Sequence, residues 1–91
     1  MLNYDINVLN KMLSKMPLVE VREWAIKVIM AEQGKTFESI AKPRRISKWY
    51  LSKAVIGKAP WNPKIVNALE KGLNVDVTGF LTEDERERNG R

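Results

Sequence analysis

Residues 36–57, TFESIAKPRRISKWYLSKAVIG, predict a short helix, a tight turn and a second helix that ends at a glycine. Most of the excess positive charge of the chain lies in and around this stretch. Between residues 35 and 64 there are eight basic residues and one acidic residue, a net charge of +7, whereas the rest of the chain has eight basic and ten acidic residues, a net charge of −2. A positive charge confined to one helical hairpin indicates a surface that binds a polyanion, and DNA is the first candidate.

The composition excludes several classes of protein. The 91 residues have the length of one small domain. The absence of cysteine and histidine excludes disulfide bonds, ordinary zinc fingers and His-based catalytic triads. Without a carboxylate pair on an apolar face or a glycine-rich phosphate loop, we expect no enzyme, no metal or other cofactor and no small-molecule substrate. No apolar run approaches the roughly 20 residues of a membrane span, and MLNYDINV is unlike a signal peptide, so we expect a cytoplasmic protein without a membrane partner.

Glycine and proline residues divide the chain into short helical segments, and no stretch shows the period-two alternation of a strand. We therefore predict an all-α bundle of about five to six short helices. The predicted helices cover residues 5–16, 19–33, 37–42, 48–56, 63–71 and 74–81. The charged tail, residues 82–91, has no apolar anchor, and we expect it to be disordered.

The predicted helix ends depend on a few residues with defined capping roles. Gly34 is well placed to end the second helix in the left-handed conformation. Thr36 and Ser47 are suitable N-caps for the third and fourth helices, because a hydroxyl can accept a hydrogen bond from an unpaired amide. Pro63 fits the first turn of the fifth helix, which Gly72 is expected to end.

Two apolar stripes lie in the first 33 residues. In the second helix the stripe contains Leu18, Val21, Ala25, Val28 and Ile29, widened by Trp24, Ile26 and Met30. We expect Trp24 and Trp61 to pack in the core or against a loop. In the first helix, which we treat as a separate element of residues 1–17, the stripe contains Ile6, Leu9, Met12, Leu13 and Met16. This stripe either packs on its own domain or pairs with a second copy, and we predict a homodimer, since two-fold dimers commonly read palindromic DNA sites.

The central stretch meets the packing requirements of a helix-turn-helix. Ala41 supplies the small residue at which the second helix crosses the first closely. Phe37 and Ile40 supply the inner face of the first helix, and Leu51 and Ala54 supply that of the second. The chain reverses between them, at residues 43–46.

Three pieces of the sequence, in the right order, resemble the lambda-repressor-like helix-turn-helix family of phage and bacterial regulators. They are AIKVIMAEQGKTFESIA, RISKWYLSKAVIG and PKIVNALEKGLNVDVTGFL, which lie within residues 18–81. The same stretch is similar to the N-terminal domain of bacterial cyanases and to Ner-type regulators. Two departures fall in the turn. Arg45 stands where the family usually has glycine, so a left-handed residue there would cost about 1 kcal/mol unless the turn differs. Pro43 and Arg44 replace an ordinary helical residue and a buried aliphatic, so we expect a reshaped turn.

The resemblance implies that the N-terminal half of the helix at residues 47–56 enters the major groove of DNA. Lys48 and Lys53 would then donate hydrogen bonds to guanine O6 and N7. Trp49 either contacts a thymine methyl or a sugar, or it folds back on the hydrophobic surface. Tyr50 either contacts a phosphate or packs. The residues predicted to read bases are Ser47, Lys48, Trp49, Ser52 and Lys53.

Phosphate contacts require only charge and reach, and a helix N-terminus also suits a phosphate. The residues predicted to contact phosphates are Thr36, Lys42, Arg44, Arg45 and Lys58. The resemblance therefore implies a sequence-specific DNA-binding regulator, phage-like or bacterial, whose partner is double-stranded DNA. The alternative is a protein-interaction or antitoxin-like adaptor that has the same fold, which the Met-rich first helix and the unusual turn favour. The simplest interpretation of the charge alone is a basic face that is exposed to solvent and binds no ligand.

Overall fold

The computed structural model describes residues 17–91, which form helices and turns and contain no strand. The all-α prediction is therefore confirmed for this part of the chain. The helices are α2 (Leu18–Gln33), α3 (Phe37–Ala41), α4 (Lys48–Val55), α5 (Pro63–Leu73) and α6 (Glu83–Arg88), with 3-10 turns η1 (Lys42–Arg44) and η2 (Thr78–Phe80). The predicted helix at residues 5–16 and its expected dimer contacts lie outside the described residues; those contacts are Ile6, Leu9, Met12, Leu13 and Met16.

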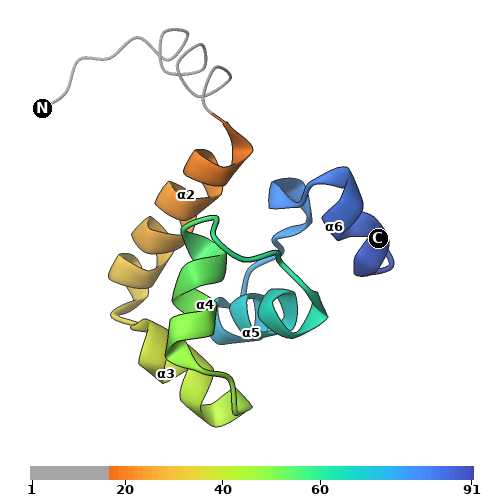
Figure 1. Cartoon of the computed structure of the whole chain (residues 1–91). Coiled ribbons are helices and arrows are strands. Elements are labelled where there is room, and N and C mark those ends of the chain that lie inside the picture. The colour runs from red at the N-terminus through yellow and green to blue at the C-terminus, as the bar shows by residue number, and fades with distance from the viewer. Residues whose placement is uncertain (1–16) are drawn as a thin grey trace, which may run out of the picture.

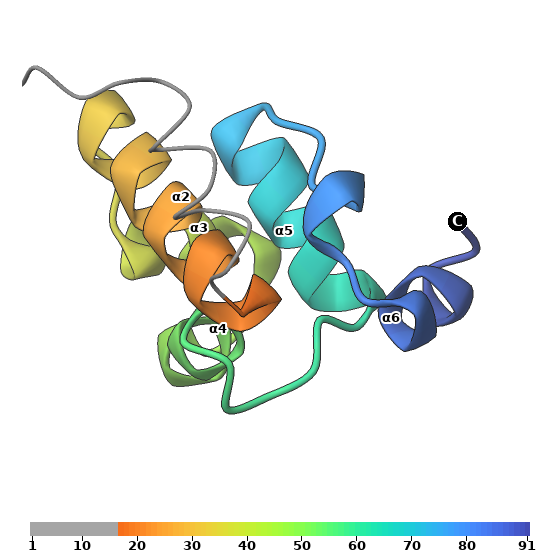
Figure 2. The same ribbon diagram turned by 90° about the horizontal axis from the view of Figure 1, so that it is seen from above.

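Four of these helices enclose the core. α4 packs against both α2 and α3, and α5 packs against the same two helices (Figure 1). The side chains at the centre, which include Ile26, Leu51, Ile65 and Leu69, are fully buried. α6 lies at the edge of the bundle, and α5 lies between it and the helices α3 and α4 (Figure 2). The α3–α4 hairpin and α6 therefore occupy opposite ends of the molecule.

Gly34 and Thr36 cap their helices as predicted, whereas Ser47 does not. Gly34 ends α2 with a φ of 64°, as predicted. The Thr36 hydroxyl accepts a hydrogen bond from the Ser39 amide, and the Ser39 hydroxyl accepts one from the Thr36 amide, which closes a capping box. Ser47 occupies the N-cap position of α4, but its side chain makes no capping hydrogen bond. Pro63 is in the first turn of α5, after Asn62, whose side chain caps the helix.

The predicted end of α5 at Gly72 is wrong. The helix continues to Leu73 and ends at Asn74, which adopts the left-handed conformation with a φ of 55°. Gly72 lies inside the helix for a different reason, the close approach of α3: a Cβ atom at this position would lie 2.8 Å from Cγ2 of Ile40. The glycine therefore permits close contact between two helices and does not end one of them.

The apolar stripe predicted for α2 is partly wrong. The buried residues of this helix are Arg22, Ile26 and Met30, whereas Trp24 is 57% exposed and Val28 is 37% exposed. Residues four apart share one face of a helix, so Arg22, Ile26 and Met30 form a single inward row. Because a charged residue occupies a position in that row, the helix is rotated away from the orientation that its apolar residues alone predict. Trp24 therefore lies on the outer face.

Trp61 agrees with the prediction of a core position. Its side chain is fully buried, and its indole Nε1 donates a hydrogen bond to the carbonyl oxygen of Ala54 at 2.7 Å. A buried indole usually needs such an acceptor. The bond attaches the loop after α4 to the last turn of α4.

The C-terminal segment differs from the prediction in two ways. The helix expected at residues 74–81 is reduced to the short turn η2, and the tail expected to be disordered forms α6. The reason is a second capping box, in which Thr82 Oγ1 accepts from the Glu85 amide and Glu85 Oε1 accepts from the Thr82 amide. Glu85 is only 6% exposed and pairs with Arg22, which gives the tail an anchor inside the bundle that is charged and not apolar.

Candidate nucleic-acid interface

The connection between α3 and α4 is a compact turn of residues 42–46. The Arg45 amide donates to the Lys42 carbonyl at 3.2 Å, and the Ile46 amide donates to the Ala41 carbonyl at 3.1 Å. Arg45 has a φ of 55°, in the left-handed region. The chain therefore places an arginine in a conformation that favours glycine, at a cost of about 1 kcal/mol. Arg45 thus adopts this conformation without being a glycine, and Pro43 is accommodated in the 3-10 helix η1.

The outer face of α4 contains most of the predicted base-reading residues. Leu51, Ala54 and Val55 are buried on the inner face, as predicted. Because successive helical residues are about 100° apart, Trp49 and Lys53 lie near the middle of the opposite face. Lys48, which is exposed, and Ser52, which is half-buried, lie at its margin, and Ser47 is exposed at the N-terminus of the helix.

Trp49 projects from this face into solvent. Its side chain is 71% exposed, so it does not fold back on the hydrophobic surface. The Lys48 Nζ atom lies 5.8 Å from the centre of the indole ring, within the range of a cation–π contact. A large flat ring and two lysine ammonium groups are therefore presented together by one short helix.

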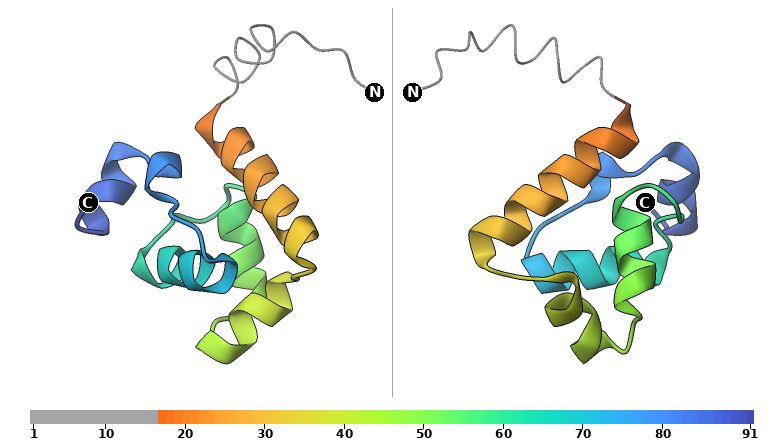
Figure 3. Two further views of the ribbon diagram at one scale, coloured as in Figure 1. Left: turned by 180° about the vertical axis from the view of Figure 1, so that it is seen from behind. Right: turned by 60° about the vertical axis from the view of Figure 1, so that its left-hand side comes forward.

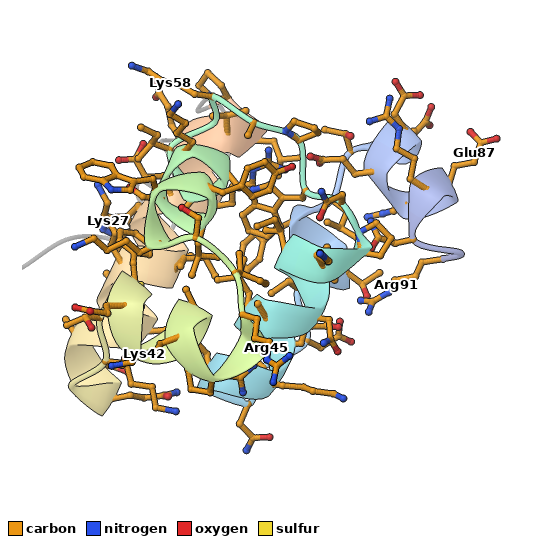
Figure 4. All side chains as sticks on the ribbon, turned by 60° about the horizontal axis from the view of Figure 1, so that its bottom comes forward. Lys27, Lys42, Arg45, Lys58, Glu87 and Arg91 are labelled. Atoms are coloured by element: carbon orange, nitrogen blue, oxygen red, sulfur yellow. The ribbon has the colours of Figure 1, made fainter. Side chains whose placement is uncertain are left out.

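Three of the predicted phosphate contacts lie at the two ends of α4. Lys42 and Arg45 are exposed at one end of the hairpin, and Lys58 is exposed at the opposite end (Figure 4). Positive charge therefore lies at both ends of α4.

Other residues of the basic stretch have roles inside the protein. The Arg44 Nη1 atom donates to the Ile40 carbonyl at 3.0 Å, and the arginine is half-buried. Lys35 donates a hydrogen bond to the carbonyl oxygen of Gly72, near the end of α5. Thr36 is engaged in its capping box. These residues help to hold the hairpin in place. Because they form hydrogen bonds within the protein, they have fewer hydrogen-bonding groups left for a ligand.

The structure places Asn62 and Lys64, which the sequence did not indicate as site residues, beside residues that were predicted. A groove runs between the start of α4 and the start of α5, and it is lined by Arg45, Ile46, Ser47, Tyr50, Asn62 and Lys64. The Asn62 side-chain amide donates to the Tyr50 hydroxyl at 2.8 Å across this groove. Two cations, two hydroxyl groups and an amide therefore surround a space that suits a phosphate group. The sequence signal was indirect, because the N-caps Ser47 and Asn62 mark two helix starts but do not show that they are neighbours.

A second groove lies on the other side of the turn and contains the one acidic residue of the basic stretch. It is lined by Glu38, Ala41, Lys42, Ile46 and Lys48. Glu38 makes no ion pair with another residue of the described chain. Its carboxylate therefore reduces the positive potential of the groove next to Lys42 and Lys48.

The charge of the hairpin is not neutralised within the described residues. Residues 17–91 contain ion pairs between Arg22 and Glu85, between Lys27 and Glu23, and between Arg91 and both Glu70 and Asp76. None of the cations between residues 42 and 64 belongs to this set. Their positive potential is therefore free to attract an external anion.

Neither a membrane segment nor a metal centre accompanies this surface in the described part of the chain. Within residues 17–91 no helix combines the length and the apolar character needed to span a bilayer. The same residues contain no cluster of three or more carboxylates that could hold a metal ion.

Comparisons with protein-family models, with curated proteins and with solved structures found no match for the chain. The geometry and the charge of the hairpin are therefore the features that indicate a function.

Proposed function

We propose that this protein is a sequence-specific DNA-binding regulator, phage-like or bacterial, that inserts α4 into the major groove of double-stranded DNA. One observation carries the proposal: α4 presents Lys48, Trp49 and Lys53 on an exposed face, and the cations at both of its ends have no carboxylate partner in residues 17–91. The major groove is about 12 Å wide and admits an α-helix. A protruding basic helix flanked by free cations has the shape and the charge for this role.

The residues have distinct roles in the proposal. Lys48 and Lys53 donate hydrogen bonds to guanine O6 and N7, and Trp49 contacts a thymine methyl or a sugar. Lys42, Arg45 and Lys58 bind phosphates and set the orientation of α4. The groove beside Tyr50 and Asn62 adds Lys64 to the phosphate contacts. If these four residues neutralise about four phosphates, the logarithm of the affinity should fall with the logarithm of salt concentration at a slope of roughly −3.6.

Selection of bound sequences from random DNA tests the proposal directly. The full chain should enrich one motif, and a homodimer should enrich a palindrome with half-sites about one helical turn apart. The double variant Lys48→Ala with Lys53→Ala should retain salt-dependent affinity but lose the motif. The double variant Arg86→Ala with Arg88→Ala removes the same charge from α6, where both residues are exposed, and should keep the motif. Selection of the same motif by the α4 double variant would refute the assignment of these lysines.

A second candidate function is supported by the exposure of Trp49. An isolated tryptophan at the centre of an exposed helical face is typical of the residues that dominate protein–protein binding. The hairpin would then serve as a protein-interaction or antitoxin-like adaptor. Binding of a protein partner that persists at high salt, without any shift of DNA at low salt, would favour this alternative over DNA binding.

A further inference from the structure

The outer face of α2 exposes an apolar surface that the DNA proposal does not use. Trp24 is 57% exposed and Val28 is 37% exposed. A groove along this face is lined by Glu20, Glu23, Trp24, Lys27, Val28 and Ala31. It lies on the side of the helix opposite to the buried row of Arg22, Ile26 and Met30. Trp24 and Val28, one helical turn apart, form a small exposed apolar patch on this face.

No helix of the described residues covers this groove. α2 lies along one edge of the bundle, and α4 and α5 lie to one side of it in both views of Figure 3. The residues that line it all belong to α2, and none of them lines the two grooves beside α4. The groove is therefore lined by residues other than those of the proposed DNA surface.

The chain contains an apolar segment that matches this groove. Residues 5–16 have apolar side chains at spacings of three and four, and these are Ile6, Leu9, Met12, Leu13 and Met16. We propose that residues 5–16 of a second copy pack into the groove on α2, so that each copy covers Trp24 of the other in a two-fold dimer. The segment has one acidic and two basic residues, and the groove has two acidic and one basic, so the net charges are opposite in sign.

The length of the connection favours a second copy over folding back within one chain. Only Pro17 separates Met16, the last residue of the apolar stripe, from Leu18, the first residue of α2. Two antiparallel helices need a loop of about 2–5 residues between them. Trp24 lies roughly 9 Å along α2 from Leu18, at 1.5 Å per residue. If the helix predicted from the sequence ends at Met16, its connection to α2 is too short for it to cover Trp24 of its own chain, whereas the segment of a partner has no such restriction.

The oligomeric state of the full chain tests the proposal without DNA, so its failure is distinguishable from a failure of the proposed function. Light scattering over a range of concentrations should detect a dimer of the unmodified chain. Trp24→Ala should raise the dimer dissociation constant by about tenfold or more, as loss of a central tryptophan contact does. Leu9→Glu should have a similar effect. Trp49→Ala is the matched control, because it also removes an exposed tryptophan, and it should leave the dissociation constant unchanged. A monomer at all concentrations, or equal effects of the two tryptophan variants, would overturn the proposal.

Disulfide trapping identifies which surfaces meet, since the natural chain has no cysteine. A mixture of Met12→Cys chains and Val28→Cys chains should give a covalent dimer of one chain of each kind under mild oxidation. A double variant with both substitutions that forms a disulfide within one chain and stays monomeric would show that the segment folds back. Met12→Cys chains that link to one another in preference to Val28→Cys chains would show that the two segments pair directly. Either of these results would overturn the proposal.

Discussion

The α3–α4 hairpin and the α6 segment are both rich in charged residues, but the charges have different surroundings. Glu85 of α6 is only 6% exposed and accepts hydrogen bonds from Arg22 at 2.6 Å, from the Trp61 amide at 2.9 Å and from the Thr82 amide at 3.0 Å. The cations of the hairpin between residues 42 and 64 have no carboxylate partner in the described chain. One carboxylate of α6 is thus buried and hydrogen-bonded within the protein, whereas most cations of the hairpin are exposed.

The buried charge forms the connection among three separate segments. The Arg22 guanidinium lies 4.4 Å from the centre of the Trp61 ring, and its Nη1 atom also donates to the Phe80 carbonyl at 3.2 Å. Asn89 donates to the Trp61 carbonyl at 3.0 Å, which adds a second link from the end of α6. A buried ion pair seldom stabilises more than apolar residues would, but the loss of one partner costs much. The buried charges that hold the fold are therefore different residues from the exposed charges that are available to a ligand. Each set can be removed by substitution without removing the other.

The largest expected effect is on stability, from removal of the buried carboxylate. Glu85→Gln leaves the Arg22 guanidinium buried without a counter-charge, and this should lower the free energy of unfolding by about 3–5 kcal/mol. Unfolding by urea, followed by circular dichroism, measures the change. The control is Glu87→Gln on the same helix, where the side chain projects into solvent (Figure 4) and the change should be within about 0.5 kcal/mol. Equal effects of the two substitutions would contradict a structural role for the pair.

The second prediction concerns the pH dependence of stability. Burial alone would raise the pKa of Glu85, but hydrogen bonds from Arg22, Thr82 and Trp61 outweigh burial and lower the pKa from 4.5 to about 2. A carboxyl whose pKa is lower in the folded state stabilises the fold above its unfolded pKa. This stabilisation, on the order of 3 kcal/mol, should be lost as pH falls from about 4.5 towards 2.

Comparison with the glutamine variant isolates this contribution. The pKa of Glu70 is also lowered, chiefly by its hydrogen bond from Arg91, so other carboxylates add to the acid dependence of the natural protein. Glu85→Gln should therefore unfold with a shallower pH dependence between about pH 5 and 2. Parallel curves for the two proteins over this range would show that Glu85 is not responsible.

The sequence predicted the elements that depend on local signals. Gly34 and Thr36 act within a few residues of themselves, so the end of α2 and the start of α3 were predictable. The inward position of Arg22 was not, because its partner Glu85 is 63 residues away. The apolar residues of α2 surround the helix, so without that pair the periodicity placed Trp24 in the core. Helix α6 was not predicted, because residues 82–91 have no apolar anchor. Thr82 and Glu85 nevertheless have the spacing of a capping box, which is a local signal for a helix start.

The same distinction applies to the candidate site. The exposed residues of α4 follow from the helical period once Leu51, Ala54 and Val55 face the core. The groove shared with Asn62 and Lys64 could not be predicted, because it depends on how the start of α5 is placed beside α4. Neighbours on one helix can be predicted from spacing, whereas neighbours on different helices require the packed structure.

The third prediction separates stability from DNA affinity at a single residue. Arg45→Gly should relieve the left-handed strain and raise the free energy of unfolding by about 0.5–1 kcal/mol. The same substitution removes one proposed phosphate contact, so the salt slope of DNA binding should become shallower by about 0.9. The measurements are urea unfolding and titration of the selected DNA at several salt concentrations. Arg88→Gly on α6 is the control for loss of charge and should leave the salt slope unchanged. A variant that is more stable and binds DNA with the original slope would remove Arg45 from the interface.

The smallest expected effect tests whether the exposed charge acts on DNA through its potential. Glu38 lines the groove that contains Lys42 and Lys48 and has no ion-pair partner in the described residues. Because its carboxylate opposes the positive potential there, Glu38→Gln should strengthen DNA binding by about two- to fivefold, a change of up to about 1 kcal/mol. Glu38 makes no side-chain hydrogen bond with another described residue, so the free energy of unfolding should stay within about 0.5 kcal/mol. Glu83→Gln on α6 has the same change in charge and should leave DNA affinity unchanged. Equal gains from the two substitutions would mean that DNA responds only to the net charge of the protein, and a loss of affinity in Glu38→Gln alone would mean that this carboxylate itself contacts a base, such as the N4 amino group of cytosine.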